Sequence, residues 1–133
     1  LLMKTTETEK QLYWEFEGVK YRGFADMIGE GFVADIKTTV DAGSKFERDL
    51  WYNDYPLQAV MYLQNFKPGT KYYIIAIEKG EPYNVQVYEM GEELLEKAEI
   101  KYRYLNDKFK AWDGKPQSYS NDIKVIGSKE FTY

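Results

Sequence analysis

The first third of the chain alternates between apolar and polar residues, which is the pattern of β-strands with one face buried. The alternation is interrupted at Gly18 and again at Gly29-Glu30-Gly31, two places where glycine favours a turn. The predicted strands cover residues 11–16, 19–28 and 32–38. They would form a three-stranded antiparallel meander, while the polar, threonine-rich residues 1–10 are expected to form an irregular lead-in.

The remainder of the chain carries both helical and strand periodicities. At 92–112 apolar residues recur at steps of three and four, with acidic residues in the first half and basic residues in the second. We interpret this segment as a helix that covers the sheet. Pro56 suits the first turn of another helix, with Asp54 as its candidate N-cap. The further predictions are a helix at 56–66, strands at 71–77 and 83–88, a mobile loop with a short helical piece at 40–54, and a polar tail at 113–133.

This order of elements, β-β-β-α-β-β-α, predicts an α+β (mixed α/β) fold in which a mixed sheet is flanked by helices. The length of 133 residues and the apolar fraction of 44% suit a single domain, at residues 1–133, with a sizeable core. No apolar run approaches the ~18 residues of a membrane span, and the first residues do not form a signal peptide. We therefore expect a cytoplasmic protein.

Composition restricts the chemistry of the chain. There is no cysteine and no histidine, which excludes disulfides, thiolate metal sites, Ser-His-Asp and Cys-His mechanisms and the usual nitrogen ligands of zinc. A metal site would have to use oxygen ligands, which favours Mg²⁺ or Mn²⁺. The net charge of −4 argues against nucleic-acid binding by overall charge alone, although a local basic lining would still permit it.

An acidic residue followed two positions later by lysine occurs four times, so the tripeptide itself carries little information. The four copies are Asp35-Ile36-Lys37, Glu99-Ile100-Lys101, Asp113-Gly114-Lys115 and Asp122-Ile123-Lys124. Only the first is expected on a strand with a partner, where residues two apart share a face and Ile36 between them can enter the core. Residues two apart on a helix lie on different sides, and the last two copies fall in a turn and in a stretch without a pairing strand.

Asp26, on the preceding strand, can join Asp35 and Lys37 on one face of a hairpin. A four-residue loop, Gly29 to Phe32, would set Asp26 directly opposite Asp35, and a two-residue loop, Gly29-Glu30, would make them diagonal neighbours. Both registers bring the carboxylates within roughly 5–8 Å, whereas an intermediate register separates them. Facing carboxylates would be stabilised by a raised pKa or by a divalent cation. The alternative is an exposed hairpin with a cross-strand ion pair.

Gln58 and Tyr62 are four residues apart and share a face of the helix at 56–66. An ordinary amphipathic helix with two surface polar groups is the alternative. Taken together with Gly23-Phe24-Ala25-Asp26 and Ala34-Asp35-Ile36-Lys37-Thr38-Thr39, this helix resembles the PD-(D/E)XK nuclease superfamily, in its RecB-like and exonuclease VIII-like branch. The resemblance covers about residues 11–66, and it implies a restriction-endonuclease-like core.

The resemblance also implies roles for individual residues. It assigns metal binding to Asp26, Asp35 and the Ile36 carbonyl, the catalytic ammonium group to Lys37, and positioning of the lysine and the DNA strand to Gln58 and Tyr62. Relatives of this branch digest linear DNA, some as ring-shaped homo-oligomers. In phage and prophage recombination they act with a single-strand annealing protein.

The sequence departs from this family at one position. The family has a further site residue, commonly His or Glu, on a helix upstream of the first strand, and this chain has no His. We expect either that the upstream helical part is lacking or that a local acid, such as Glu7 or Glu9, takes its place. Activity of the chain by itself depends on which of the two holds.

The loop at 40–54 supplies additional candidates for DNA binding. Lys45 and Arg48 could meet phosphates, and Trp51, Tyr52 and Tyr55 could stack on bases or DNA ends. A solvated loop with packed aromatic residues is the alternative. Three functional classes are therefore in competition: an Mg²⁺- or Mn²⁺-dependent exodeoxyribonuclease acting on linear, double-stranded DNA, a catalytically incomplete nuclease-like module that binds DNA or a partner, and a non-enzymatic interaction domain.

Overall fold

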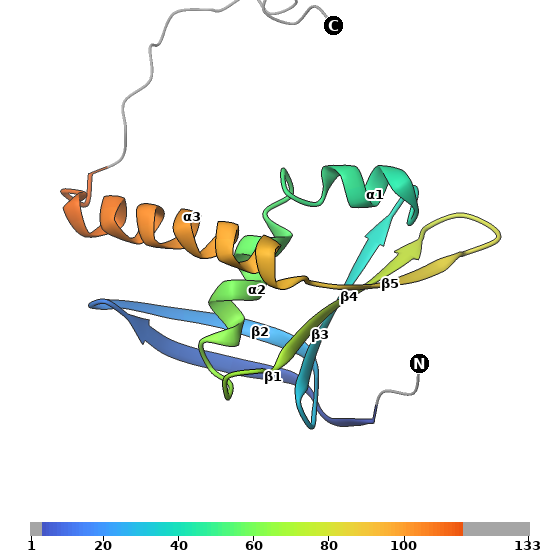
Figure 1. Ribbon diagram of the computed structural model, residues 1–133, viewed down its shortest axis with the longest axis horizontal. Coiled ribbons are helices and arrows are strands. Elements are labelled where there is room, and N and C mark those ends of the chain that lie inside the picture. The colour runs from blue at the N-terminus through green and yellow to red at the C-terminus, as the bar shows by residue number, and fades with distance from the viewer. Residues whose placement is uncertain (1–3, 116–133) are drawn as a thin grey trace, which may run out of the picture.

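The computed structural model describes residues 4–115, which form five strands and three helices (Figure 1). The elements are β1 (Thr5–Phe16), β2 (Val19–Gly29), β3 (Phe32–Thr39), α1 (Ser44–Asp49), α2 (Tyr55–Leu63), β4 (Lys71–Glu78), β5 (Val85–Glu89) and α3 (Glu92–Ala111). Helix α1 is the short helical piece expected within 40–54. Most of the predicted tail at 113–133, from residue 116 onward, lies outside the described residues.

The strands form one mixed sheet in the order β1-β2-β3-β4-β5. Neighbouring strands are antiparallel except β3 and β4, which are parallel. A parallel pair requires a crossover connection, and here the crossover carries α1 and α2. All three helices lie on one side of the sheet (Figure 1). The predicted α+β architecture, with its antiparallel meander inside a mixed sheet, is confirmed.

Helix α3 covers the hairpin of β1 and β2 through aromatic packing and hydrogen bonds. The rings of Phe16 and Tyr102 stack with their centroids 4.2 Å apart. The indole N–H of Trp14 donates to the Tyr102 hydroxyl at 3.0 Å, and the Tyr21 hydroxyl donates to Asn106 Oδ1 at 2.5 Å. Tyr102 and Asn106 are fully buried. The interpretation of this helix as cover for the sheet is therefore confirmed.

β1 begins at Thr5 rather than at Gln11, so the expectation of an irregular lead-in is wrong. The reason is that β2 continues to Gly29 and offers pairing partners as far as Thr5. The threonines of this segment are β-branched and favour a strand. A register shift between Thr5 and Glu7 and a φ of 48° at Glu9 show where the strand departs from regular geometry.

Helix α2 is shorter than expected and begins without a side-chain cap. Asp54 occupies the N-cap position, but its side chain makes no capping hydrogen bond, and its carboxylate lies 2.5 Å from the ammonium nitrogen of Lys101 on α3. The helix ends at Leu63 because the N–H of Phe66 bonds to the Leu63 carbonyl, which tightens the chain into a turn before Pro68.

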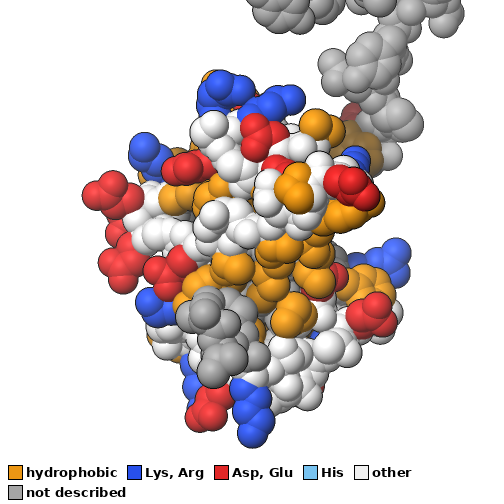
Figure 2. Space-filling view, turned by 90° about the vertical axis from the view of Figure 1, so that its right-hand side faces the viewer, with side chains coloured by type: hydrophobic (Ala, Val, Ile, Leu, Met, Phe, Trp, Pro, Cys, Tyr) orange, Lys and Arg blue, Asp and Glu red, His pale blue; other side chains and the backbone are white. Residues whose placement is uncertain are grey.

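The other side of the sheet carries no helix among residues 4–115, and several apolar side chains stay exposed there. Ile36 is 43% exposed, so the expectation that it enters the core is wrong: the helices cover only the face that bears Asp35. Phe24 and Val85 are also exposed. Figure 2, viewed from the side where β4 and β5 project in Figure 1, shows hydrophobic side chains gathered in a band between charged ones. No helix of the described part of the chain is long and apolar enough to cross a membrane.

Candidate functional site

The hairpin of β2 and β3 has the register in which Asp26 stands opposite Asp35. The pairs along it are Met27–Ala34, Ile28–Val33 and Gly29–Phe32. Continuing this register by one pair brings the two aspartates together. The turn consists of Glu30 and Gly31 instead of four residues, and the φ of 80° at Gly31 is a conformation that glycine adopts at little cost.

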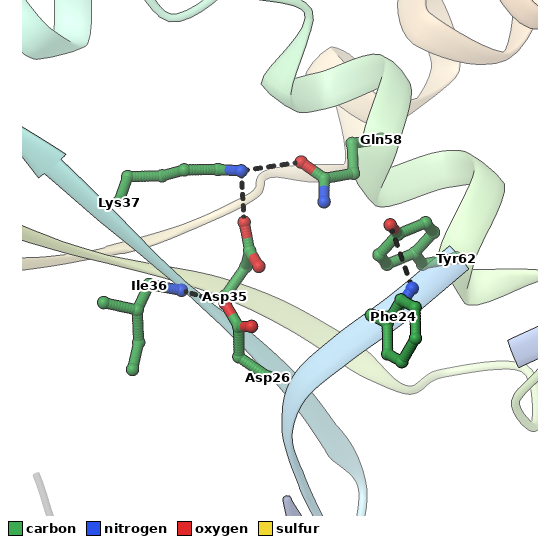
Figure 3. Close-up of polar contacts among 7 residues, drawn as sticks. All are labelled: Phe24, Asp26, Asp35, Ile36, Lys37, Gln58 and Tyr62. Carbon is green, nitrogen blue, oxygen red and sulfur yellow. Dashed lines mark hydrogen bonds and ion pairs between the residues drawn. The ribbon is translucent and has the colours of Figure 1, made fainter. Parts of the chain in front are cut away.

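The two carboxylates have different surroundings although they share one face (Figure 3). Asp26 Oδ2 accepts a hydrogen bond of 2.8 Å from the backbone N–H of Ile36. Asp35 is 5% exposed, and its Oδ2 lies 2.7 Å from the ammonium nitrogen of Lys37. Figure 3 shows the Ile36 side chain pointing away from these groups. The strand thus presents its acid and its lysine to the helix side and its isoleucine to the open side, as the alternation of a strand requires.

These surroundings separate the pKa values of the two carboxyl groups. Burial, reinforced by the neighbouring Asp26, raises the pKa of Asp35 to about 6, even though Lys37 acts in the opposite direction. Burial also acts to raise the pKa of Asp26, but hydrogen bonds from Asp35 and the Ile36 N–H, together with the charge of Lys37, outweigh it and lower the pKa below its ordinary value. Near pH 6, Asp26 is therefore ionised while Asp35 exchanges a proton.

Helix α2 brings Gln58 and Tyr62 to this face of the hairpin, as the Gln-x-x-x-Tyr spacing predicts. Gln58 Oε1 accepts a hydrogen bond of 3.0 Å from the Lys37 ammonium group, so the amide and Asp35 hold the lysine from two sides (Figure 3). The Tyr62 hydroxyl accepts a hydrogen bond of 3.3 Å from the Phe24 N–H. The Tyr62 ring rests on β2 where Gly23 leaves room for it, because a Cβ at position 23 would lie 2.6 Å from that ring.

Tyr55 lies beside the lysine instead of on the loop surface. The Lys37 ammonium nitrogen is 4.8 Å from the centroid of the Tyr55 ring, a distance typical of a cation–π contact. The Tyr55 ring stacks on Phe46 of α1, and Phe46 stacks on Tyr88 of β5. Sequence reasoning did not find Phe46 or Tyr88, because only the tertiary arrangement joins three aromatic residues from distant segments.

The other loop candidates are not brought to the carboxylates. Lys45 is exposed, Arg48 lies 3.7 Å from Asp49 Oδ1, and Tyr52 is 84% exposed. Trp51 packs at the edge of the core, with the Lys101 ammonium nitrogen 5.4 Å from its ring centroid. Trp51 is therefore a packed aromatic residue, as the alternative interpretation of this loop predicts. For Lys45, Arg48 and Tyr52, contact with DNA remains a prediction.

The hairpin offers oxygen donors of the kind that a hard divalent cation needs. Asp26 and Asp35 supply carboxylate oxygens, and Asp35 Oδ2 forms an ion pair with the Lys37 ammonium group at 2.7 Å. Oxygen ligands of this kind suit Mg²⁺ or Mn²⁺, which commonly keep several water molecules. Neither Glu7 nor Glu9 completes a set of three acidic ligands, since the described residues contain no such group. Glu7 instead pairs with Lys10 at 2.9 Å.

The mixed sheet, the crossover with its helices and the paired aspartates with a lysine define a restriction-endonuclease-like fold. Residues 2–123 match the family described as "PDDEXK-like domain of unknown function (DUF3799)", and the chain belongs to that family. No match was found among curated protein sequences. The resemblance to the PD-(D/E)XK superfamily is thereby confirmed, while the exonuclease VIII-like branch stays a prediction.

Two solved structures share the fold. The crystal structure of a "Putative exonuclease" from Eubacterium rectale is similar with a TM-score of 0.64 and 15% sequence identity, over 77% of this chain and 43% of that one. The crystal structure of SSO0001 is similar with a TM-score of 0.53 and 24% identity, over 81% of this chain and 51% of that one. The chain thus spans about half the length of these two structures.

Proposed function

We propose that this protein is a metal-dependent deoxyribonuclease, acting as an exonuclease on linear double-stranded DNA. The observation that carries the proposal is the convergence of Asp26, Asp35 and Lys37 on one face of a hairpin, with Gln58 of α2 bonded to the lysine. The same chain belongs to a PDDEXK-like family, and one structure of the same fold comes from a protein whose name includes exonuclease.

Each residue has a chemical task in this proposal. Asp26 and Asp35, with the Ile36 carbonyl, would hold Mg²⁺ or Mn²⁺, which when bound lowers the pKa of a water molecule and offsets phosphate charge. Lys37 presents a proton donor and a positive charge to the phosphate, where negative charge grows in the transition state. Gln58 restricts the lysine to one orientation through the 3.0 Å hydrogen bond. Tyr62 fixes the distance between α2 and β2 at the edge of the site.

A second candidate is a nuclease-like module that binds DNA or a partner without cutting. Its support is that residues 4–115 contain no third acidic ligand beside Asp26 and Asp35. In this case the hairpin could still hold a cation, but cleavage would be absent.

Cleavage assays separate the candidates. The wild type and Lys37→Ala are incubated with Mg²⁺ or Mn²⁺ and with linear or covalently closed circular DNA of one sequence. An exonuclease degrades only the linear form, and Lys37→Ala should be inactive. Equal degradation of both forms would point to an endonuclease, and no degradation by the wild type would favour the binding module. Full activity of Lys37→Ala would refute the assigned role of the lysine.

A further inference from the structure

Tyr72 is a buried tyrosine of β4 whose hydroxyl has no hydrogen-bond partner within residues 4–115. The side chain is 1% exposed. A buried hydroxyl without a hydrogen bond costs about 1–3 kcal/mol of stability, and phenylalanine would fill the same space without this cost. The Tyr72 hydroxyl therefore requires an explanation outside the packing of the core.

The register of the sheet places this tyrosine beside the candidate metal site. Tyr72 pairs with Val33, and the next residue of β4 on the same face, Ile74, pairs with Asp35. Tyr72 and Asp35 thus project from neighbouring parallel strands to the helix side, offset by one pleat, or roughly 6.6 Å along the strand. The charges of Asp35 and Asp26 both act on the Tyr72 hydroxyl, which places it near the two aspartates.

Asp35, on the same face as Tyr72, is also buried, and its Oδ2 contacts the Lys37 ammonium group at 2.7 Å. Asn106 Nδ2, another buried atom without a hydrogen bond in residues 4–115, belongs to α3 in a different part of the core. The unpartnered Tyr72 hydroxyl therefore lies on the face that carries the carboxylate proposed to hold the cation. A hydroxyl can both donate and accept a hydrogen bond, so it suits a polarised water molecule.

We propose that Tyr72 is a positioning residue of the metal site, whose hydroxyl forms a hydrogen bond to a water molecule bound to the divalent cation at Asp26 and Asp35. The inference rests on the proposed function, since it assumes that these carboxylates hold the cation. The hydroxyl acts on the orientation of the water and does not touch the substrate. Groups that contact metal-bound ligands in this way commonly change metal affinity by about 10- to 100-fold when removed.

The test uses Tyr72→Phe, which removes the hydroxyl and keeps the ring. Manganese chloride is titrated calorimetrically into the wild type and the variant, and thermal unfolding is followed with and without the metal. Tyr72→Phe should bind Mn²⁺ about tenfold more weakly. Without metal, the thermal midpoint of the variant should not fall below that of the wild type, because removing this hydroxyl breaks no hydrogen bond within the protein.

Tyr21→Phe is the matched control, since the Tyr21 hydroxyl donates to the buried Asn106 and lies on the α3 side of β2. It should lower the midpoint without metal and leave Mn²⁺ affinity unchanged. Unchanged Mn²⁺ affinity in Tyr72→Phe would overturn the inference and leave the proposed function standing. A midpoint lowered as in Tyr21→Phe would overturn it as well, since the hydroxyl would then have a partner in the metal-free protein. Equal binding by the wild type and Asp35→Asn would refute the metal site and this inference together.

Discussion

Replacing Gly23 with alanine should displace Tyr62, because the two residues touch with no room for a side chain. A Cβ at position 23 would lie 2.6 Å from Tyr62 Cε1 and 2.8 Å from its Cζ and hydroxyl oxygen. Overpacking costs about 1–3 kcal/mol, and losing the hydrogen bond from the Phe24 N–H costs about 0.5–1.5 kcal/mol. Alanine offsets about 0.4–1 kcal/mol because it restricts the unfolded chain. The expected net loss in the free energy of unfolding is about 0.5–4 kcal/mol.

Urea unfolding of a double-mutant cycle measures this contact. In a Tyr62→Ala background the obstructing ring is absent, so Gly23→Ala should cost less than about 0.5 kcal/mol there. Gly80→Ala is the control, since nothing lies within 4 Å of a Cβ at that position, and it should leave stability unchanged or raise it by up to about 1 kcal/mol. An equal loss in the free energy of unfolding from Gly23→Ala in both backgrounds would refute the conclusion that the Tyr62 ring packs against Gly23.

Three other properties of the site and the core can be measured. The pKa of Asp35 is raised from 3.8 to about 6, so between these pH values the folded state binds a proton that the unfolded state does not, and the free energy of unfolding should fall as pH rises. Urea unfolding at several pH values should show a smaller fall in Asp35→Asn, and an equal fall in both proteins would contradict the raised pKa of Asp35. Calorimetry at pH 8 should find that Lys37→Ala binds Mn²⁺ within about threefold of the wild type, because the ammonium group is not a ligand, and a complete loss of binding would make the lysine essential to the metal site. Tyr102→Phe leaves the Trp14 indole N–H without its acceptor and should cost about 1–2 kcal/mol in urea unfolding, whereas a change below about 0.3 kcal/mol would mean that water replaces the hydroxyl.

The local patterns of the sequence predicted the strands of the central hairpin and the faces on which the candidate site residues lie. Alternation identified β2 and β3, and the spacing of Asp35 and Lys37 placed both on one face, as the structure has them. The four-residue step from Gln58 to Tyr62 likewise placed both side chains toward the hairpin. These features depend on strand and helix periodicity, which a single segment carries by itself.

Other features depend on contacts between distant segments, and the sequence did not predict them. Thr5 joins β1 because β2 is long enough to pair with it, and Ile36 is exposed because the helices cover only one side of the sheet. Tyr55 lies against Lys37 because Phe46 of α1 packs behind it. The burial of Tyr72 is another such case, since a strand rich in apolar residues gives no sign of which hydroxyl lacks a partner.

Calorimetric titration with manganese chloride tests most directly whether Asp26 and Asp35 form one cation site. Wild type, Asp26→Asn and Asp35→Asn are titrated at pH 8, where the carboxyl group of Asp35 is ionised in the wild type. Each substitution keeps the size of the side chain and removes one charge. Binding by the wild type and its loss in both variants is the predicted result. Equal binding by all three proteins would contradict the account, because the cation would then be held elsewhere.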